Sequence, residues 1–263
     1  MIAIRSPKEL ELLREANRIV AIVLKKVAAM ARPGVSTAQL DEEAERLIKE
    51  MGAIPAFKGY MGYPCSVCAS VDEQVVHGIP CERELIDGEI VSIDIGTNYR
   101  GYHGDAAVTV PVGNVSSEKR RLMRVTKRAL KLGISAAHAG NRVSDISRAV
   151  QTEVERNGFS VIRQFVGHGI GTSPHEDPQV PNFVTESHGP QLRPAMVIAI
   201  EPMVSAGSGE VEILEDNWTA VTVDRKPAAH FEHTIVIREG EPEVLTLIRG
   251  DDTIRRDENR LNG

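Results

Sequence analysis

Long apolar runs are absent from this 263-residue sequence. Its two longest, Ile19–Leu24 and Ala195–Ile200, each contain six residues, whereas a membrane-spanning helix needs about 20. The segment Met1–Pro7 also lacks a basic region followed by an apolar stretch, which is the pattern of a secretory signal. We therefore expect no transmembrane segment and no membrane partner, and a cytoplasmic location is favoured.

Cysteine is scarce as well. Three cysteines in a chain of this length do not make a disulfide framework. Cys65 and Cys68 have the spacing of one half of a zinc site, but no second pair completes it, and Cys81 stands alone. We expect three free thiols, which agrees with a reducing cytoplasm.

An excess of positive charge is the third absence. The chain has 31 lysines and arginines against 37 aspartates and glutamates, a net charge of −6, whereas a nucleic-acid binder normally carries a concentrated basic face. We therefore expect no DNA partner. Hydrophobic residues make up 41% of the chain, and this ordinary share for a globular protein excludes disordered and fibrous classes.

Helical patterns occur in two pairs. Ser6-Pro7-Lys8-Glu9 has the form of a capping box with proline in the first turn, and apolar residues follow at helical spacing as far as Pro33-Gly34. A second helix is expected from Ser36 to Gly52. The same periodicity returns over Ser117–Ala139 and Ser144–Asn157.

Strand-like segments follow each pair of helices. They are Ile90–Ile95, Ala106–Pro111, Val161–Val166, Ala195–Met203, Trp218–Val223 and Phe231–Ile237. The repeated order of two helices and then strands predicts one α+β domain over residues 1–263, with halves at about 6–113 and 114–248 that share an antiparallel sheet. The charged tail, residues 249–263, is expected to be flexible.

Two aspartates lie in the expected hairpin. Asn98–Gly101 forms its turn, and if Tyr99 and Arg100 are the central residues, Asp94 and Asp105 lie directly opposite each other. Like charges facing each other across two strands are destabilising. A divalent cation bound by both carboxylates would compensate for this repulsion. Two exposed aspartates in a slipped or bulged register are the alternative.

Two glutamates and a histidine are further candidate metal ligands. Glu201 follows the buried-strand pattern Ala195–Ile200, and Glu232 lies in another such segment; a carboxylate is costly to bury unless it is paired or bound to metal. His168 lies among three glycines, which let backbone approach a ligand closely. A strand-end glutamate that reaches water, or a structural histidine, would explain any one of these alone. Together with the aspartate pair they favour a metal site.

These residues carry a family resemblance. Their flanking sequences are Val76-His77-Gly78-Ile79-Pro80, Gly167-His168-Gly169-Ile170-Gly171, Ile200-Glu201-Pro202 and Phe231-Glu232-His233-Thr234. The chain resembles a bacterial type I methionine aminopeptidase from about Ser6 to Leu247. The resemblance implies the pita-bread fold, with two pseudo-symmetric αβ halves around a curved antiparallel sheet, and removal of the initiator methionine from nascent proteins with a small second residue.

The resemblance also implies a ligand set. Asp94, Asp105, His168, Glu201 and Glu232 match, in this order, the five ligands of the family's two divalent metal ions. It implies that Asp105 and Glu232 bridge the ions, that Asp94 completes one shell, and that His168 and Glu201 complete the other. Glu201 would also move the proton of the attacking water. Manganese, iron and cobalt all suit such ligands, so the sequence does not name the metal.

The substrate pocket is assigned by the same resemblance. His77 and His175 match residues that contact the substrate outside the metal shell. Five further positions match residues of the methionine pocket: Phe57, Tyr60, Tyr63, Cys68 and Trp218. Pro174 stands where relatives often carry an aromatic residue, so the resemblance does not assign that side of the methionine pocket. The expected partners are N-termini of nascent polypeptides, at the ribosome, bound by a monomer.

Two alternatives stay open at this point. A related pita-bread peptidase that cleaves X-Pro bonds would share the ligands, although such enzymes usually carry a separate N-terminal domain and only five residues precede the first helical pattern here. A non-catalytic binding homologue would share the fold, although such proteins typically lose ligands and all five are present.

Overall fold

The computed structural model describes residues 2–248, so the tail for which flexibility is expected lies outside the described residues. Four helices are present: α1 (Pro7–Ala28), α2 (Thr37–Glu50), α3 (Ser117–Ser135) and α4 (Val143–Arg156), with a short 3₁₀ turn, η1 (Tyr60–Gly62). The capping box expected at Ser6 forms, and the helix start expected at Ser36 is also a capping box. No helix in the described range is long and apolar enough to cross a membrane.

The strands of the described chain pair antiparallel. In the first part they are β1 (Ile54–Pro55), β2 (Val67–Val71), β3 (Gln74–Val76), β4 (Ile90–Tyr99) and β5 (Tyr102–Pro111). In the second part they are β6 (Ser160–Val161), β7 (Gly167–Gly169), β8 (Glu176–Val180), β9 (Val197–Ile200), β10 (Met203–Ser205), β11 (Val211–Ile213), β12 (Ala220–Thr222), β13 (Ala228–His230), β14 (His233–Val236) and β15 (Glu243–Val244).

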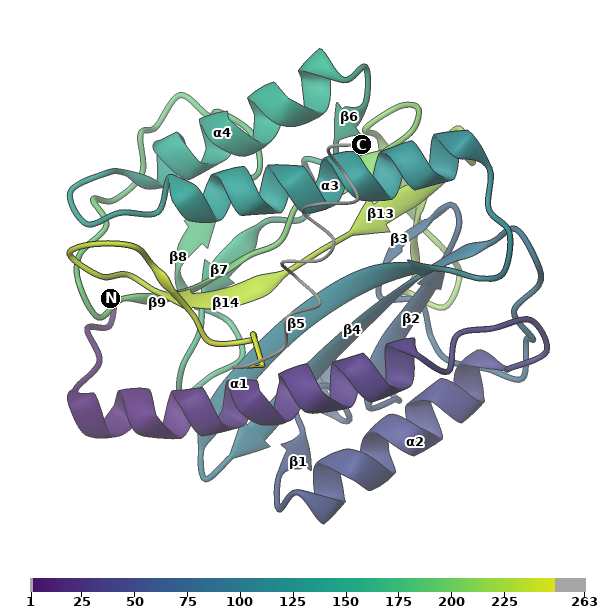
Figure 1. The fold of residues 1–263 in the computed structure, drawn as a ribbon, viewed down its shortest axis with the longest axis horizontal. Helices are drawn as coiled ribbons and strands as arrows, with labels where there is room; N and C mark the ends of the chain where they lie inside the picture. The colour runs from purple at the N-terminus through teal and green to yellow at the C-terminus, as the bar shows by residue number, and fades with distance from the viewer. Residues whose placement is uncertain (1, 249–263) are drawn as a thin grey trace.

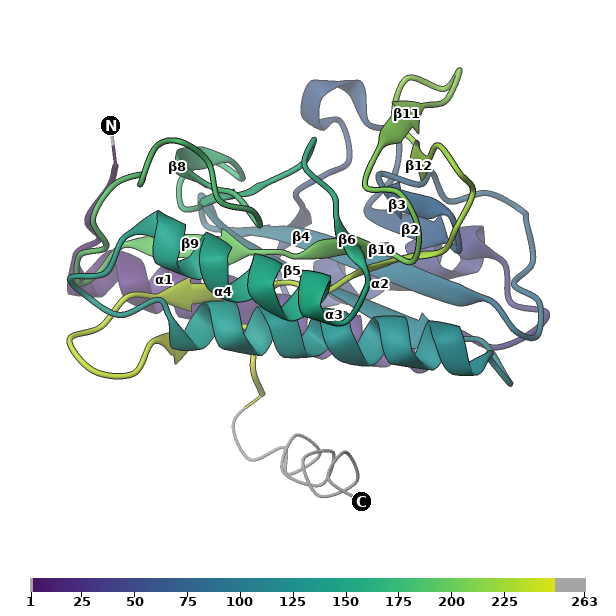
Figure 2. The same ribbon diagram turned by 90° about the horizontal axis from the view of Figure 1, so that it is seen from above.

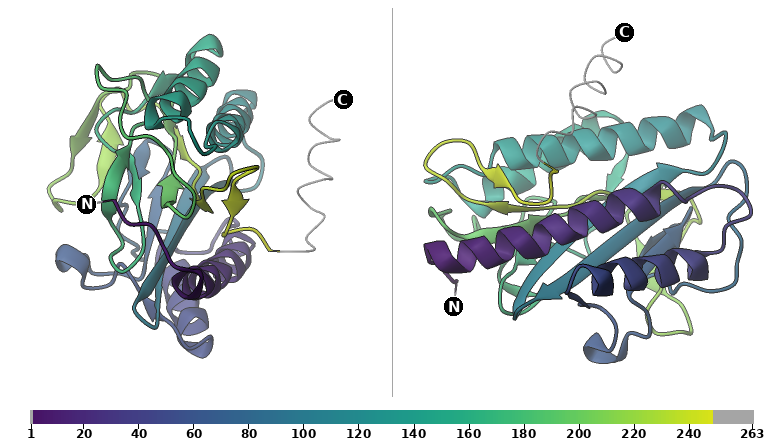
Figure 3. Two further views of the ribbon diagram at one scale, coloured as in Figure 1. Left: turned by 90° about the vertical axis from the view of Figure 1, so that its left-hand side faces the viewer. Right: turned by 60° about the horizontal axis from the view of Figure 1, so that its bottom comes forward.

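The helices flank the strands as two pairs. Figure 1 shows α1 with α2 on one side of the molecule and α3 with α4 on the other, with β5, β9 and β14 between them. Helix α1 lies across β4 and β5 (Figure 3). Strand β8 and the β11–β12 hairpin project from the strands on the side opposite α3 (Figure 2). The two largest of the four hydrophobic clusters in the described residues each lie between a helix pair and the neighbouring strands, and the N-terminal end of α1 also packs on β9 and β14 through Leu10 and Leu13.

The strands form four hydrogen-bonded sheets, in the orders β1-β4-β2 with β5 on β4, β13-β10-β6, β11-β12-β3 and β15-β14-β9-β7-β8. The antiparallel sheet that the sequence predicts is thus divided into four hydrogen-bonded groups of strands in the described residues. The halves meet where β5 runs beside the segment before β14: the Glu232 N–H donates to the Ala107 carbonyl at 2.9 Å, and the Thr234 hydroxyl donates to the Asp105 carbonyl at 2.8 Å. This seam brings residues from both halves together.

The register expected for the β4–β5 hairpin is wrong by one turn position. The central residues are Arg100 and Gly101, both with positive φ, at 52° and 84°, rather than Tyr99 and Arg100. Two positive φ values are typical of a type I′ hairpin turn, which favours glycine. Asp94 therefore pairs with Ala107, and Asp105 pairs with Gly96. The two aspartates are diagonal neighbours on one face of the sheet, not direct partners.

Several predicted strands are shorter than expected, and two of them border the site. The segment Ala195–Met203 breaks into β9 and β10 at Glu201-Pro202, because proline has no N–H to donate to a ladder. Of the segment Val161–Val166 only Val161 lies in a strand, as the second residue of β6, and the chain then leaves the sheet. Both departures have a consequence for the site: Glu201 comes free of the ladder, and Phe165 and Val166 line a cavity.

Candidate active site

The five candidate metal ligands converge from five strands. Asp94 lies on β4 and Asp105 on β5, while His168 is the middle residue of β7. Glu201 follows the last residue of β9, and Glu232 precedes the first residue of β14. All five line one cavity of about 230 Å³. The two halves of the chain therefore both supply ligands.

The geometry suits a metal ion. Asp105, His168 and Glu232 each place one ligand atom within 4.8 Å of the others. The His168 Nε2 atom lies 3.3 Å from Glu201 Oε1, and the carboxyl groups of Asp94 and Asp105 are close enough to shift each other's pKa. Three of the carboxyl oxygens are buried without a hydrogen-bond partner among the described residues: Asp94 Oδ1, Asp105 Oδ1 and Glu232 Oε1. Unpaired buried carboxylates are costly unless a cation binds them, so these residues fit a metal centre.

The protonation states agree with that reading. Burial raises the pKa of Asp94 to about 7, and burial together with the neighbouring carboxylates raises the pKa of Glu201 and Glu232 well above the usual range. Burial, with a smaller contribution from His175, lowers the pKa of His168 to about 3. The imidazole is therefore neutral and able to bind a metal, and a cation bound beside the acids would lower their pKa values and displace their protons.

The other residues assigned to the substrate line the same cavity. They are Phe57, Tyr60, Tyr63, Cys68, His77, His175 and Trp218. The rings of Tyr63 and Trp218 meet edge to face at 5.1 Å, and the His77 ring packs on Phe165 at 5.3 Å. The hydroxyl of Tyr60 lies 3.1 Å from His175 Nδ1. Cys65, Cys68 and Cys81 are free thiols, as expected.

The glycines around His168 serve packing rather than access for a ligand, contrary to the sequence interpretation. A Cβ atom on Gly167 would lie 2.4 Å from the Ala199 carbonyl oxygen, and one on Gly169 would lie 2.1 Å from that of Asp177. Both glycines let β7 lie tightly between its neighbours. Gly96 has a similar role toward the pocket, because a Cβ atom there would meet the Phe57 ring at 2.5 Å.

Sequence reasoning missed His230. Its side chain is 2% exposed, lines the cavity and places Nε2 3.7 Å from Glu201 Oε2. Burial lowers its pKa to about 3, so the ring is neutral. A signal was present: His230 lies two residues before Glu232, and alternate residues of an extended segment share a face. Phe165 gave no such signal, because it lies in a segment that the apolar pattern assigns to a strand.

Carboxylates and a neutral imidazole that together line a cavity are the arrangement of a metallohydrolase. Residues 11–239 match the family model "Metallopeptidase family M24". The chain is 53% identical to methionine aminopeptidase 1 of Bacillus subtilis over 94% of its own length and 100% of that relative. The chain therefore belongs to metallopeptidase family M24 and, within it, to the methionine aminopeptidases, whose pita-bread fold it has.

Solved structures agree. Methionine aminopeptidase from Thermotoga maritima superposes with a TM-score of 0.92 at 45% identity, over 94% of this chain and 100% of that one. Prolidase from Pyrococcus furiosus superposes with a TM-score of 0.77 at 22% identity, over 94% of this chain and 66% of that one. The second likeness concerns the fold alone.

Proposed function

We propose that this metallopeptidase removes the N-terminal methionine of peptides and nascent proteins whose second residue is small. The observation that carries the proposal is a single cavity that combines the five candidate metal ligands with an aromatic-lined pocket. The related methionine aminopeptidases are up to 53% identical over nearly the whole chain, which favours cleavage after an N-terminal methionine over cleavage of X-Pro bonds. All five ligand positions are intact, which disfavours a non-catalytic homologue.

The proposed metal centre holds two divalent ions of manganese, iron or cobalt. Asp105 and Glu232 would bridge them, Asp94 would complete one shell, and His168 with Glu201 would complete the other. Bound there, the ions would lower the pKa of a shared water and polarise the scissile carbonyl. The donor set of carboxylates and one imidazole suits all three metals.

Glu201 is the proposed general base and acid. Its side chain is 12% exposed, and its pKa is raised by burial first and by the charges of Asp94 and Asp105 next. A raised pKa suits a group that takes a proton from water and returns it to the departing amine. The amide of Asn182 donates to the Glu201 backbone carbonyl at 3.0 Å and so holds this residue in place.

His77 and His175 are the proposed substrate contacts beside the ligands. Burial lowers the pKa of His77 to about 4 and also lowers that of His175, so both rings are neutral and can donate a hydrogen bond to the scissile amide as it becomes tetrahedral. Phe57, Tyr63 and Trp218 form the aromatic part of the methionine pocket, since thioether sulfur packs favourably on aromatic rings.

Location and partners are further parts of the proposal. We place the protein in the cytoplasm as a monomer that meets its substrates at the ribosome. Six exposed cationic side chains form a stripe along α3, and they support a contact with ribosomal RNA despite the acidic total charge. They are Arg120, Arg121, Arg124, Lys127, Arg128 and Lys131.

A peptide series tests the proposed specificity. We expect the rate of methionine release to fall steeply from Met-Gly through Met-Ala to Met-Leu peptides, because the resemblance implies a site that admits a small second residue. Matched peptides with N-terminal leucine, acetyl-methionine or Ala-Pro serve as controls and should remain intact. Equal rates across the methionine series would indicate a broader aminopeptidase, and preferred cleavage of Ala-Pro would indicate an X-Pro peptidase.

Substitution of His77 separates a catalytic from a structural role. His77 has a positive φ of 60°, which asparagine tolerates better than alanine does, so His77→Asn is measured beside His77→Ala. Both variants should keep their metal, and the rate should fall about 10²–10³-fold, as for the loss of one oxyanion donor. His138→Ala, in the connection between α3 and α4, is the control. A large drop in Tm with near-normal turnover per folded molecule would mean that His77 is structural.

A further inference from the structure

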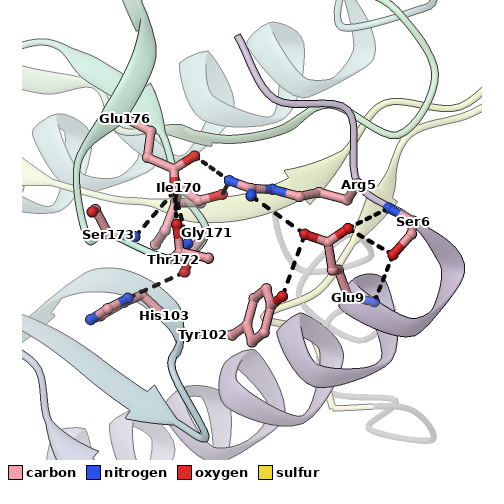
Figure 4. Close-up of polar contacts among 10 residues, drawn as sticks. All are labelled: Arg5, Ser6, Glu9, Tyr102, His103, Ile170, Gly171, Thr172, Ser173 and Glu176. Atoms are coloured by element: carbon pink, nitrogen blue, oxygen red, sulfur yellow. Dashed lines mark hydrogen bonds and ion pairs between the residues drawn. The ribbon is translucent and has the colours of Figure 1, made fainter. Parts of the chain in front are cut away.

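Arg5 is a buried cation outside the cavity. It lies in the segment before α1, is 8% exposed, and its backbone N–H donates to the Ala195 carbonyl at 3.0 Å. Its guanidinium forms an ion pair with Glu176, donates to the Ile170 carbonyl at 3.3 Å and lies 3.8 Å from Glu9. Figure 4 shows the guanidinium between these two glutamates. Burying an arginine here needs a reason, because a buried charge is costly.

Glu176 uses its other carboxyl oxygen to hold a loop. Its Oε1 atom accepts hydrogen bonds from the backbone N–H groups of Thr172 at 2.8 Å and Ser173 at 3.1 Å, and from the Thr172 hydroxyl at 3.1 Å. One carboxylate therefore joins Arg5 to the turn that follows β7 (Figure 4). We call residues 171–175 the histidine loop, because His175 ends it and lines the cavity.

The histidine loop is also held from β5. The carbonyl of Gly171 accepts from the His103 N–H at 2.8 Å and lies 3.2 Å from His103 Nδ1. The other ring nitrogen of His103 lies 3.0 Å from the amide nitrogen of Asn98, which fits a neutral ring protonated on Nδ1. These contacts fix the start of the loop, whereas Glu176 fixes its middle.

Gly171 makes room for the arginine. A Cβ atom at this position would lie 1.8 Å from Arg5 Nη2 and 2.2 Å from its Cζ. The third glycine of the segment Gly167–Gly171 therefore accommodates neither a ligand nor a neighbouring strand, but the guanidinium. The loop backbone and the arginine are built to fit each other.

We propose that Arg5 is a positioning residue for His175. By neutralising Glu176, it keeps that carboxylate on the loop N–H groups, and the loop then presents the His175 ring beside Tyr60 and His168. The inference rests on the proposed substrate contact of His175. Without the arginine, a half-buried carboxylate would turn toward water, and the loop amides would lose their acceptor.

A double-mutant cycle tests the coupling. Arg5→Met keeps the length of the side chain and removes the charge, and it should lower kcat/KM about 10–100-fold, as expected for a small misplacement of a substrate contact. In a His175→Ala background, the same substitution should cost less than about twofold, because the contact that it positions is already gone. Arg5→Lys should restore most of the rate. Glu176→Gln removes the other member of the ion pair. It should show the same dependence on His175, even if an Arg5 variant fails to fold.

Amide exchange gives a readout that does not depend on turnover. Arg5→Met should speed hydrogen exchange at Thr172 and Ser173 and leave the amides of α3 unchanged. Arg14→Met is the matched control, because Arg14 lies in α1 and forms a bidentate ion pair with Glu243 at 2.7 and 3.0 Å. This substitution should alter neither amide exchange in the histidine loop nor turnover per folded molecule.

The outcomes are distinct. Equal losses from Arg5→Met with and without His175, or unchanged exchange at Thr172 and Ser173, would overturn the positioning role while leaving the proposed function intact. Full activity of His175→Ala alone would overturn the substrate contact itself, and the positioning role with it.

Discussion

Asp105→Ala is expected to lose bound metal and activity together. Asp105 is 4% exposed, and its Oδ1 atom is buried without a hydrogen-bond partner in the described part of the chain. It lies close to His168 and Glu232 as well, so a cation bound by this cluster needs its carboxylate. As the proposed bridge between two ions, it contributes to both shells, and its removal should weaken both.

Metal content by elemental analysis and release of methionine from a Met-Ala peptide are measured on one preparation. Asp145→Ala, which removes an aspartate from the first turn of α4, is the control and should keep both properties. Full activity of Asp105→Ala in metal-buffered solution would contradict the assignment of the cluster.

Glu201→Gln is expected to lower kcat about 10²–10⁴-fold, the usual contribution of general acid–base catalysis, while part of the metal stays bound. The amide keeps one oxygen as a weaker ligand but cannot take up and return a proton. The Asn182 hydrogen bond goes to the backbone of residue 201, so the substitution leaves it in place. Turnover and metal content distinguish this variant from Asp105→Ala.

Activity of Glu201→Gln within a few-fold of the unmodified protein would assign the base to another group. His230, whose Nε2 lies 3.7 Å from Glu201 Oε2, is the neighbour to substitute next in that case. A complete loss of metal would instead make Glu201 chiefly a ligand.

Local signals in the sequence account for much of the fold. The capping boxes at Ser6 and Ser36 predict the starts of α1 and α2, because serine and a glutamate or glutamine three residues later satisfy free N–H groups within one turn. Proline and glycine likewise predict breaks. The hairpin shows the limit of this reasoning: asparagine and glycine identify the turn, but only the positive φ at both Arg100 and Gly101 sets the register.

The site could be predicted where a residue conflicts with its surroundings. Carboxylates inside apolar strands, such as Asp94 and Glu232, stand out because burial is costly for them. Phe165 carries no such conflict, and His230 is indicated only by its alternation with Glu232 along an extended segment. The contact between Arg5 and Glu176 joins residues 171 positions apart, and no local pattern predicts a pairing that only the folded chain creates.

The most direct test of the metal-dependent function is a titration of initial rates. The protein is stripped of metal, manganese is added in known equivalents, and release of methionine from a Met-Ala peptide is followed beside an Ala-Pro control. We predict no turnover without metal, a return of activity that is complete near two equivalents, and an intact Ala-Pro peptide throughout. Methionine release by the metal-free protein, or faster cleavage of Ala-Pro than of Met-Ala, would contradict the proposed function.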